Sequence, residues 1–257
     1  MEDLWQPHNY GAFKNERAQP FFDLLTYVTP CPNMRIVDLG CGSGELTLAA
    51  HRRFHAADTI GIDSSAAMLE AAPLQAPENF HLRRADIADF TARPGSFDLL
   101  LSNAALHWLP DHPRLLTRLA TLVSARGQVA VQVPANEIHP SQQIANAVAA
   151  EEPFARALNG YQRRTPVLRP EAYRRLMSAL RFSQVRCEYR TYRHKLACSA
   201  AVVDWVRSTL LTDFEKRMSP ESFAGFLARY RERLLAEIGD VSPYQLTYRR
   251  LFLWGAS

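Results

Sequence analysis

The sequence predicts an α/β protein with a doubly wound parallel sheet, and three observations lead to this prediction. Short apolar runs alternate with helical patterns from residue 35 onwards. Residues 97–102 form a nearly continuous apolar run, as expected for a central strand that is buried on both faces. A glycine-rich stretch follows the first apolar run, where a strand turns into a helix. Such repetition places helices on both faces of a parallel sheet.

The first half contains regular strand–helix units. Apolar runs predict strands at residues 35–39, 59–63, 80–83, 97–102 and 127–133. Helices are predicted at residues 45–54 and at residues 113–123, which open on a proline. Another helix is predicted to begin at Ser64, which is a good N-cap.

The second half has longer helical segments. Helices are predicted at residues 140–160 with a break at Pro153, and at 170–180, 199–210 and 220–238; strands are predicted at 184–196 and 245–254, and a loop at 160–170. We interpret the chain as a single domain over residues 1–257. Its predicted parts are an N-terminal lid (1–30), a cofactor-binding half (31–134), a helical cap (135–169 and 197–240) and the completion of the sheet (170–196 and 241–257).

Composition excludes several classes of protein. Of the 257 residues, 47% are hydrophobic and 22% are charged, which is typical of a globular protein. The chain has no run of about 18 apolar residues, so no membrane span is expected. The N-terminus lacks the pattern of a signal peptide. The four cysteines lie far apart without metal-ligand spacing, so we expect free thiols, no metal site and a cytoplasmic location.

Charge is distributed unevenly along the chain. Residues 1–150 contain 11 basic and 15 acidic residues, whereas residues 151–257 contain 19 and 11. The basic second half predicts an anionic partner such as nucleic acid, an acidic lipid or a small anion.

Residues 38–44, Asp-Leu-Gly-Cys-Gly-Ser-Gly, indicate a ligand site. A strand that ends in alternating glycines exposes bare backbone, and the next helix offers its N-terminal N–H groups. The spacing is not the Gly-x-Gly-x-x-Gly of nicotinamide sites, because Leu46 and Thr47 stand where the third glycine belongs. No Gly-Lys-Ser/Thr follows, which excludes a P-loop. The carboxylate of Asp38 suits a cationic amino group better than a pyrophosphate.

Polar residues also end the next three predicted strands. Asp63 follows Gly44 by 19 residues, where an acidic residue can hold two ribose hydroxyls. Asp86 ends the third strand, where its carboxylate can accept from an adenine amino group, with Ile87 against the ring. Asn103 ends the fourth strand. One such residue alone is more often a helix cap, but four in register indicate a binding site.

In these features, residues 35–134 resemble the class I S-adenosylmethionine-dependent methyltransferases. The resemblance implies S-adenosyl-L-methionine as the cofactor and a Rossmann-like sheet of seven strands with an antiparallel last strand. It also implies a set of cofactor-binding residues: Asp38, Gly40, Cys41, Gly42, Asp63, Ser64, Met68, Asp86, Ile87 and Asn103.

A more specific resemblance extends over the whole chain. An ordered set of motifs is similar to the family of trans-aconitate 2-methyltransferases: Trp5–Pro20, Gly61–Ser65, Leu106–His112, Val131–Pro134, Tyr192–His194, Asp204–Val206 and Arg250–Phe252. The resemblance implies a cytosolic enzyme that esterifies a carboxylate of trans-aconitate. A carboxylate is already ionised at neutral pH, so in-line placement in a water-poor pocket needs no general base.

A tricarboxylate acceptor needs cationic and hydrogen-bonding anchors. Our candidates for substrate contact are Tyr10, Trp108, Arg164, Tyr192 and His194, and further basic candidates are Arg163, Arg169, Arg174 and Arg249. A nucleic-acid partner is not expected, because the Asp/Asn-Pro-Pro-aromatic motif of amino-methyltransferases is absent after the fourth strand.

Two departures from the family pattern leave alternatives open. His107 stands where glutamine is common, and it is a candidate base for a hydroxyl acceptor, a donor to a carboxylate or a wall of the cofactor pocket. Thr212 and Asp213 replace an expected Arg-Pro, so Asp213 is expected to repel a trianion unless the segment 163–169 compensates. The alternatives are an O-methyltransferase of another metabolite, with His107 as base, and a non-catalytic cofactor-binding protein.

Overall fold

The computed structural model describes residues 14–72, 75–207 and 209–257, without the side chains of residues 14–17. The chain forms two compact units. Of these described residues, unit 1 contains those up to 135 with 166–190 and 250–257, and unit 2 contains those within 136–165 and 191–249. Within the described ranges, no helix is both long and apolar enough to span a membrane. The division into lid, cofactor-binding half and cap stays a prediction.

The described residues form one sheet of seven strands in the order β3-β2-β1-β4-β5-β7-β6. β1 to β5 are parallel neighbours in this order, and β7 pairs with β5 in the antiparallel direction. The predicted sheet with an antiparallel last strand is thereby confirmed. The strands are β1 (Arg35–Leu39), β2 (Asp58–Asp63), β3 (Phe80–Arg84), β4 (Phe97–Asn103), β5 (Val123–Pro134), β6 (Gln184–Leu196) and β7 (Tyr244–Ala256).

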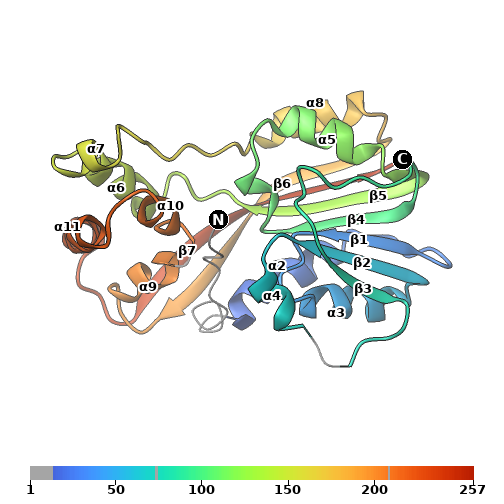
Figure 1. The fold of residues 1–257 in the computed structure, drawn as a ribbon, viewed down its shortest axis with the longest axis horizontal. Helices are drawn as coiled ribbons and strands as arrows, with labels where there is room; N and C mark the ends of the chain where they lie inside the picture. Colours follow the sequence, from blue (N-terminus) through green and yellow to red (C-terminus); the bar gives the residue numbers. More distant parts are fainter. Residues whose placement is uncertain (1–13, 73–74, 208) are drawn as a thin grey trace. The chain divides into compact units, whose positions relative to one another are not determined.

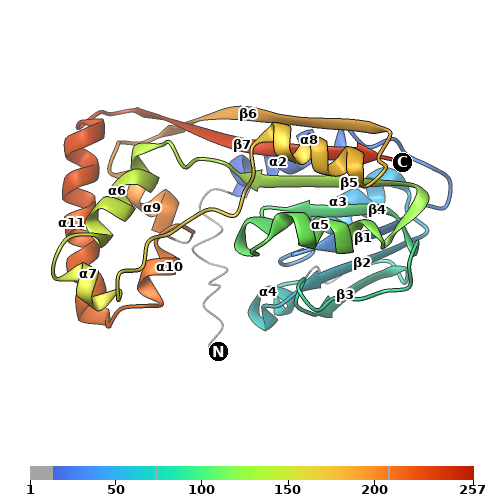
Figure 2. The ribbon, with the colours of Figure 1, turned by 90° about the horizontal axis from the view of Figure 1, so that it is seen from above.

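Helices cover both faces of the sheet in unit 1. α5 (His112–Ala120) and α8 (Pro170–Ala179) lie on one face, and α2 (Lys14–Leu25) and α3 (Glu45–Phe54) lie on the other (Figures 1 and 2). Leu115, Leu119 and Met177 pack with apolar residues of β1 and β4 in a continuous core. Burying these apolar side chains supplies the main stabilisation of the sheet. The carboxyl ends of the parallel strands β1 to β5 lie at one edge, where ligands bind in such sheets.

Some predicted boundaries in unit 1 are wrong, among them the start of β5, which was predicted at residue 127 and lies at Val123. The helix predicted to reach residue 123 ends at Ala120, because Val123 pairs with Phe97 and begins β5. The N-cap of α4 (Ala66–Glu70) is Ser65 and not Ser64, since the Ser65 hydroxyl accepts a hydrogen bond from the Met68 N–H. A short 3₁₀ turn, η1 (Leu106–Trp108), follows β4.

Unit 2 is helical apart from the segments of β6 and β7 that it contains. Its helices are α6 (Pro140–Ala149), α7 (Phe154–Ala157), α9 (Ala201–Arg207), α10 (Thr212–Glu215) and α11 (Pro220–Ile238). The ring of Phe226 on α11 stacks on that of Phe214 and meets that of Phe154 edge-on, with centroids 5.1 and 5.6 Å apart. This aromatic core holds α7, α10 and α11 together.

Candidate functional site

The glycine loop connects β1 to α3, and its backbone is held at the end of β2. The N–H groups of Gly40 and Cys41 both donate to the Ile62 carbonyl, at 2.8 and 2.9 Å. Gly40, Gly42 and Gly44 have positive φ angles of 77°, 59° and 77°, which only glycine adopts readily. The loop is therefore tightly turned at the carboxyl edge of the sheet, where ligands bind in such folds.

Two of these glycines are also surrounded closely. A Cβ atom added to Gly40 would lie 2.2 Å from Cβ of Ala105, in the turn after β4. A Cβ atom added to Gly42 would lie 3.0 Å from Cε of Met68. Cys41 between them is partly buried, and burial raises the pKa of its thiol. The loop thus presents bare backbone and an un-ionised thiol.

Asp38 is a buried carboxyl group with one unsatisfied oxygen. Its Oδ2 accepts a hydrogen bond of 2.6 Å from the Thr47 hydroxyl. Its Oδ1 is buried and has no hydrogen-bond partner among the described residues. Burial, with a smaller contribution from the charge of Asp63, raises the pKa of Asp38 to about 6, although the bond from Thr47 opposes the rise. A cationic donor beside Oδ1 would satisfy this oxygen and stabilise its ionised form.

Asp63 at the end of β2 holds the glycine loop and the start of α4. Its Oδ2 accepts from the Gly42 N–H at 2.8 Å, and its Oδ1 accepts from the Ser65 N–H at 2.9 Å. The carboxylate is partly exposed, and each oxygen keeps lone pairs for a further donor. Ser64 next to it is exposed, and its carbonyl accepts from Nε of Arg84.

Asp86 and Ile87 lie in the turn after β3. Asp86 is exposed, and its Oδ1 accepts from the Ala88 N–H at 2.8 Å, which fixes the carboxylate in an Asx turn. Ile87 is buried, and its carbonyl accepts from Nη2 of Arg118 on α5 at 2.6 Å. The same guanidinium binds the Phe90 carbonyl at 2.6 Å, so it holds both ends of this turn.

Asn103 at the end of β4 belongs to a chain of polar contacts. Its Oδ1 accepts a hydrogen bond of 2.6 Å from Nε2 of Gln132 on β5. The Oε1 of Gln132 in turn accepts from Nη1 of Arg250 on β7, at 3.2 Å. Both Gln132 and Arg250 are buried. The amide of Asn103 is thereby oriented with its NH₂ group directed away from Gln132.

Sequence reasoning missed Thr47, Arg118 and Gln132 as residues that hold this site. Gln132 had a visible signal, because a polar residue interrupts the apolar run of β5. Thr47 had no signal of its own, because a threonine inside a helical pattern does not show that its hydroxyl meets Asp38. Arg118 had no local signal, since its partners Ile87 and Phe90 lie about 30 positions earlier in the chain.

His107 and Trp108 lie together in η1, directly after β4. Their ring centroids are 4.8 Å apart at 41°, and both side chains are partly exposed. Both belong to unit 1, like the predicted cofactor residues. Tyr10, the candidate substrate residue at the N-terminus, lies outside the described residues.

The remaining substrate candidates belong to unit 2. His194 is buried and stacks on Tyr192 and Trp205, with centroids 6.4 and 4.8 Å apart. The Trp205 ring also contacts Tyr248, with centroids 5.8 Å apart. Arg164 is exposed on the loop before Pro166. Tyr192 and His194 are thus brought together in one aromatic stack, and Arg164 is not part of it.

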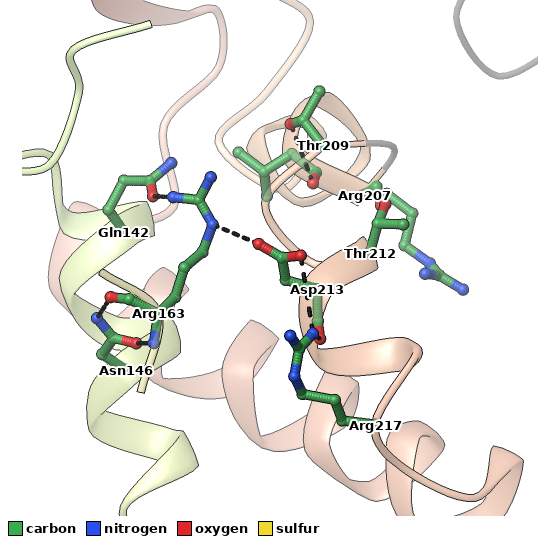
Figure 3. Close-up of polar contacts among 9 residues, drawn as sticks. Gln142, Asn146, Arg163, Arg207, Thr209, Thr212, Asp213 and Arg217 are labelled. Carbon is green, nitrogen blue, oxygen red and sulfur yellow. Dashed lines mark hydrogen bonds and ion pairs between the residues drawn. The ribbon is translucent and has the colours of Figure 1, made fainter. Parts of the chain in front are cut away.

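Asp213 lies between two arginines in unit 2 (Figure 3). Its Oδ2 is 2.9 Å from Nε of Arg163, and its Oδ1 is 3.8 Å from Nη1 of Arg217. The side chains of Arg163 and Asp213 are only 16% and 17% exposed. The negative charge that was expected to repel an anionic acceptor is therefore compensated by cations of the chain itself.

The loop that carries Arg163 is bound to α6 as well. The Asn146 side chain accepts from the Arg163 N–H and donates to the Arg163 carbonyl, both at 2.9 Å (Figure 3). Two of the other basic candidates also have acidic partners in their own units: Arg174 binds Glu171 at 3.0 Å and Arg249 lies 3.5 Å from Glu137. Arg164 and Arg169 are the exposed candidates of this loop.

Known proteins resemble this chain in sequence and in fold. A family model for a methyltransferase domain matches residues 36–127. A trans-aconitate 2-methyltransferase of Deinococcus radiodurans is 39% identical over 97% of both chains, and one of Variovorax paradoxus is 36% identical over 90% of this chain and 88% of its own. The structure of Haemonchus contortus phosphoethanolamine N-methyltransferase 2 with S-adenosyl-L-methionine shares the fold, with a TM-score of 0.54 and 15% identity, over 93% of this chain and 52% of that chain.

The fold and the matched domain are those of an S-adenosylmethionine-dependent methyltransferase, and S-adenosylmethionine is the cofactor. Since identity of 39% extends over nearly the full length, the chain belongs to the trans-aconitate 2-methyltransferase family.

Proposed function

We propose that the chain transfers a methyl group to a carboxylate of a small anionic acid, and that trans-aconitate is this acceptor. The observation that carries the proposal is the 39% identity over 97% of both chains to an enzyme of that name. A carboxylic acid in water ordinarily has a pKa of about 4, so the acceptor is ionised at neutral pH. No residue of the chain therefore has to remove a proton from it.

The residues of unit 1 fit the cofactor. The buried Oδ1 of Asp38 has no hydrogen-bond partner among the described residues and suits the ammonium of an amino acid. Gly40 and Gly42 have φ angles of 77° and 59°, so the loop turns tightly just after Asp38 and presents backbone rather than side chains. We assign the ammonium to Asp38 and the adjacent part of the amino acid to the loop from Gly40 to Gly42.

The nucleoside part of the cofactor is assigned to the ends of β2 and β3. Asp63 has both oxygens oriented by backbone N–H groups and keeps lone pairs for the two ribose hydroxyls. Asp86 is held in its turn through Oδ1, which leaves Oδ2 for an adenine amino group. Ile87 is assigned to the adenine ring, with Ser64, Met68, Cys41 and Asn103 as further contacts.

The chemistry requires alignment rather than proton transfer. When bound, S-adenosylmethionine supplies a methyl group activated by the positive sulfonium. In our assignment, His107 and Trp108 wall this region and keep water out, and His107 donates a hydrogen bond to an acceptor oxygen. This role of His107 differs from that of a base, which only a hydroxyl acceptor would need.

The anionic acceptor is assigned to basic residues of the second half. Asp213 does not oppose this assignment, because Arg163 and Arg217 compensate its charge. Arg164 is exposed and keeps a guanidinium fork that matches a carboxylate. We assign Arg164 to a carboxylate that does not react, together with Tyr10, Tyr192 and His194 as further acceptor contacts.

The test is incubation with methyl-labelled S-adenosylmethionine and a panel of acids: trans-aconitate, its cis isomer, its saturated analogue, citrate and fumarate. The expected product is a methyl ester of trans-aconitate, identified by mass and by release of labelled methanol in mild alkali. A label that resists alkali would indicate an ether or a methylamine. Ester on none of the acids would overturn the proposal, while label on a hydroxyl acceptor that is lost in His107→Gln would favour His107 as a base.

A further inference from the structure

The turn after β4 lies directly against the glycine loop. Ala104 opens the turn with a φ angle of 53°, and its N–H donates to the Gln132 carbonyl at 2.8 Å. Ala105 follows, and its Cβ occupies the space that a Cβ on Gly40 would need. His107 and Trp108 come next in η1. A shift of this turn would therefore move both side chains relative to the loop.

The ring of His112 holds this turn from the other side. His112 is the first residue of α5, and its Nε2 lies 3.0 Å from the Leu106 carbonyl oxygen. The same carbonyl accepts the Leu109 N–H at 3.0 Å. A carbonyl oxygen can only accept, so the hydrogen of the neutral ring is on Nε2, and Nδ1 is an acceptor.

Tyr173 on α8 supplies the donor that this acceptor needs. Its hydroxyl is hydrogen-bonded to Nδ1 of His112, and its oxygen accepts from the Leu168 N–H at 3.2 Å. The bonds run in one direction, from Leu168 through Tyr173 and His112 to Leu106. We call Tyr173 and His112, with the three hydrogen bonds from Leu168 to Leu106, the His112–Tyr173 relay; all of its residues belong to unit 1.

The relay is shielded from solvent, and its histidine is neutral. The side chains of His112 and Tyr173 are each 2% exposed. Burial lowers the pKa of His112, although the carbonyls of Leu106 and Leu109 and the charge of Asp111 oppose this effect. Buried polar pairs of this kind stabilise one arrangement strongly, because a lost partner leaves a desolvated group without a hydrogen bond.

We propose that His112 and Tyr173 are positioning residues for methyl transfer, because their relay fixes the turn Ala104–Trp108 against Gly40. The inference rests on the proposed function in one respect, namely that His107 and Trp108 wall the reacting region. Neither relay residue needs to touch cofactor or acceptor. Small misplacements of groups around an in-line reaction cost up to about a hundredfold in rate, so the relay acts on kcat rather than on cofactor affinity.

A matched pair of substitutions at one position separates positioning from packing. His112→Gln places an amide N–H near the former Nε2 and keeps the bond to Leu106. His112→Asn places its amide near the former Nδ1 and loses that bond. We expect kcat to fall about tenfold to a hundredfold in His112→Asn and Tyr173→Phe, and to be largely retained in His112→Gln, with cofactor affinity changed less than threefold in all.

Two control substitutions change a histidine and a tyrosine that are buried like His112 and Tyr173 but do not hydrogen-bond to the turn Ala104–Trp108. His51 is 6% exposed and bonds to the Thr59 hydroxyl at 2.9 Å. Tyr230 is fully buried and donates to the Ser141 carbonyl at 3.1 Å. His51→Gln and Tyr230→Phe are expected to lower the melting temperature as much as the relay variants do and to leave kcat unchanged.

The outcomes decide between the proposals. Equal loss of kcat in His112→Gln and His112→Asn, or loss that follows melting temperature through the controls, would overturn the relay. If the wild type methylates a hydroxyl and no carboxylate, the proposed function fails, and the same kcat comparison is made on that acceptor. If no acceptor is found, hydrogen exchange of the Trp108 and Leu109 amides tests whether His112 fixes the turn. His112→Asn must then raise their exchange above that of His51→Gln, and equal exchange in both variants refutes the inference.

Discussion

The carboxylate of Asp63 accepts a hydrogen bond from the backbone N–H of Gly42, with 2.8 Å between Oδ2 and the nitrogen. The residue at the end of β2 therefore also supports the loop at the end of β1. Its second oxygen holds the Ser65 N–H at the start of α4. In our assignment, one side chain both shapes the loop and binds the ribose.

Asp63→Ala removes both of these supports and the proposed ribose acceptor. We expect cofactor affinity, measured by calorimetry, to weaken by at least a hundredfold, because charge-assisted bonds to two hydroxyls and two N–H groups are lost together. Asp58→Ala is the control, since Asp58 lies at the opposite end of the same strand and its carboxylate is 3.7 Å from an exposed histidine, His81. Equal affinity of Asp63→Ala and the wild type would contradict the assignment.

Cofactor affinity should depend on pH through Asp38. The pKa of Asp38 in the free protein is raised to about 6, mainly by burial, and an ammonium beside Oδ1 favours the ionised form. Binding below this pKa must then release a proton, so affinity should fall up to about tenfold per pH unit as pH drops below about 6. Calorimetry between pH 5 and 8 measures this.

Two variants check the source of this pH dependence. Asp38→Asn should bind the cofactor weakly and without the inflection. Thr47→Val removes the hydrogen bond that lowers the pKa of Asp38, so the inflection should move to higher pH. An unchanged inflection in Asp38→Asn would assign the titration to another group.

Gly40→Ala tests the contact between the loop and the turn after β4. The added Cβ would lie 2.2 Å from Cβ of Ala105, and Gly40 has a φ of 77°. Gly160 is a matched control, because its φ is 72° and an added Cβ would meet no atom within 4 Å. Gly160→Ala should cost about 1–2 kcal/mol of unfolding free energy from backbone strain alone. Gly40→Ala should lower the unfolding free energy several times more and abolish cofactor binding. Equal losses in the two variants would show that the turn after β4 moves to accommodate the added Cβ atom.

Asp213→Asn should destabilise unit 2. The change leaves Arg163 and Arg217 without their counterion in a setting where Arg163 and Asp213 are less than one-fifth exposed. We expect a loss of about 1–3 kcal/mol in urea unfolding. Glu152→Gln is the control, because its pair with Arg156 is 3.8 Å long and highly exposed, and such pairs contribute little. A loss no larger than that of the control would mean that solvent screens the Asp213 cluster.

Most of the fold could be predicted because it is encoded by local periodicity. β1, α3 and β6 have the predicted bounds, since each is a run of one period that ends at a glycine, a polar residue or a turn. The start of β5 was missed because residues 124–127, Ser-Ala-Arg-Gly, do not alternate in hydrophobicity, and pairing with β4 makes Val123 part of the strand. α10 was missed because four residues are too few to show a helical period.

The candidate site could be predicted only in part. The residues proposed for the cofactor follow successive strand ends, and the order of parallel strands is enough to bring such ends to one edge. Compensation of Asp213 was predicted only for the segment 163–169 as a whole, because the sequence does not show which of its residues meets Asp213. Arg163, 50 residues earlier, contacts it directly.

The sequence by itself determined the family, the cofactor class, the positions of most strands along the chain and the glycines that only a tight loop requires. These features depend on the types of residues and on short intervals between them along the chain, and both can be read directly from the sequence. Tertiary structure alone decided which distant groups meet: Ala105 with Gly40, Tyr173 with His112 and Arg163 with Asp213. A hydrogen bond or an ion pair depends on distances of about 3 Å, and folding brings groups 50 or more residues apart to such distances without a trace in the local pattern.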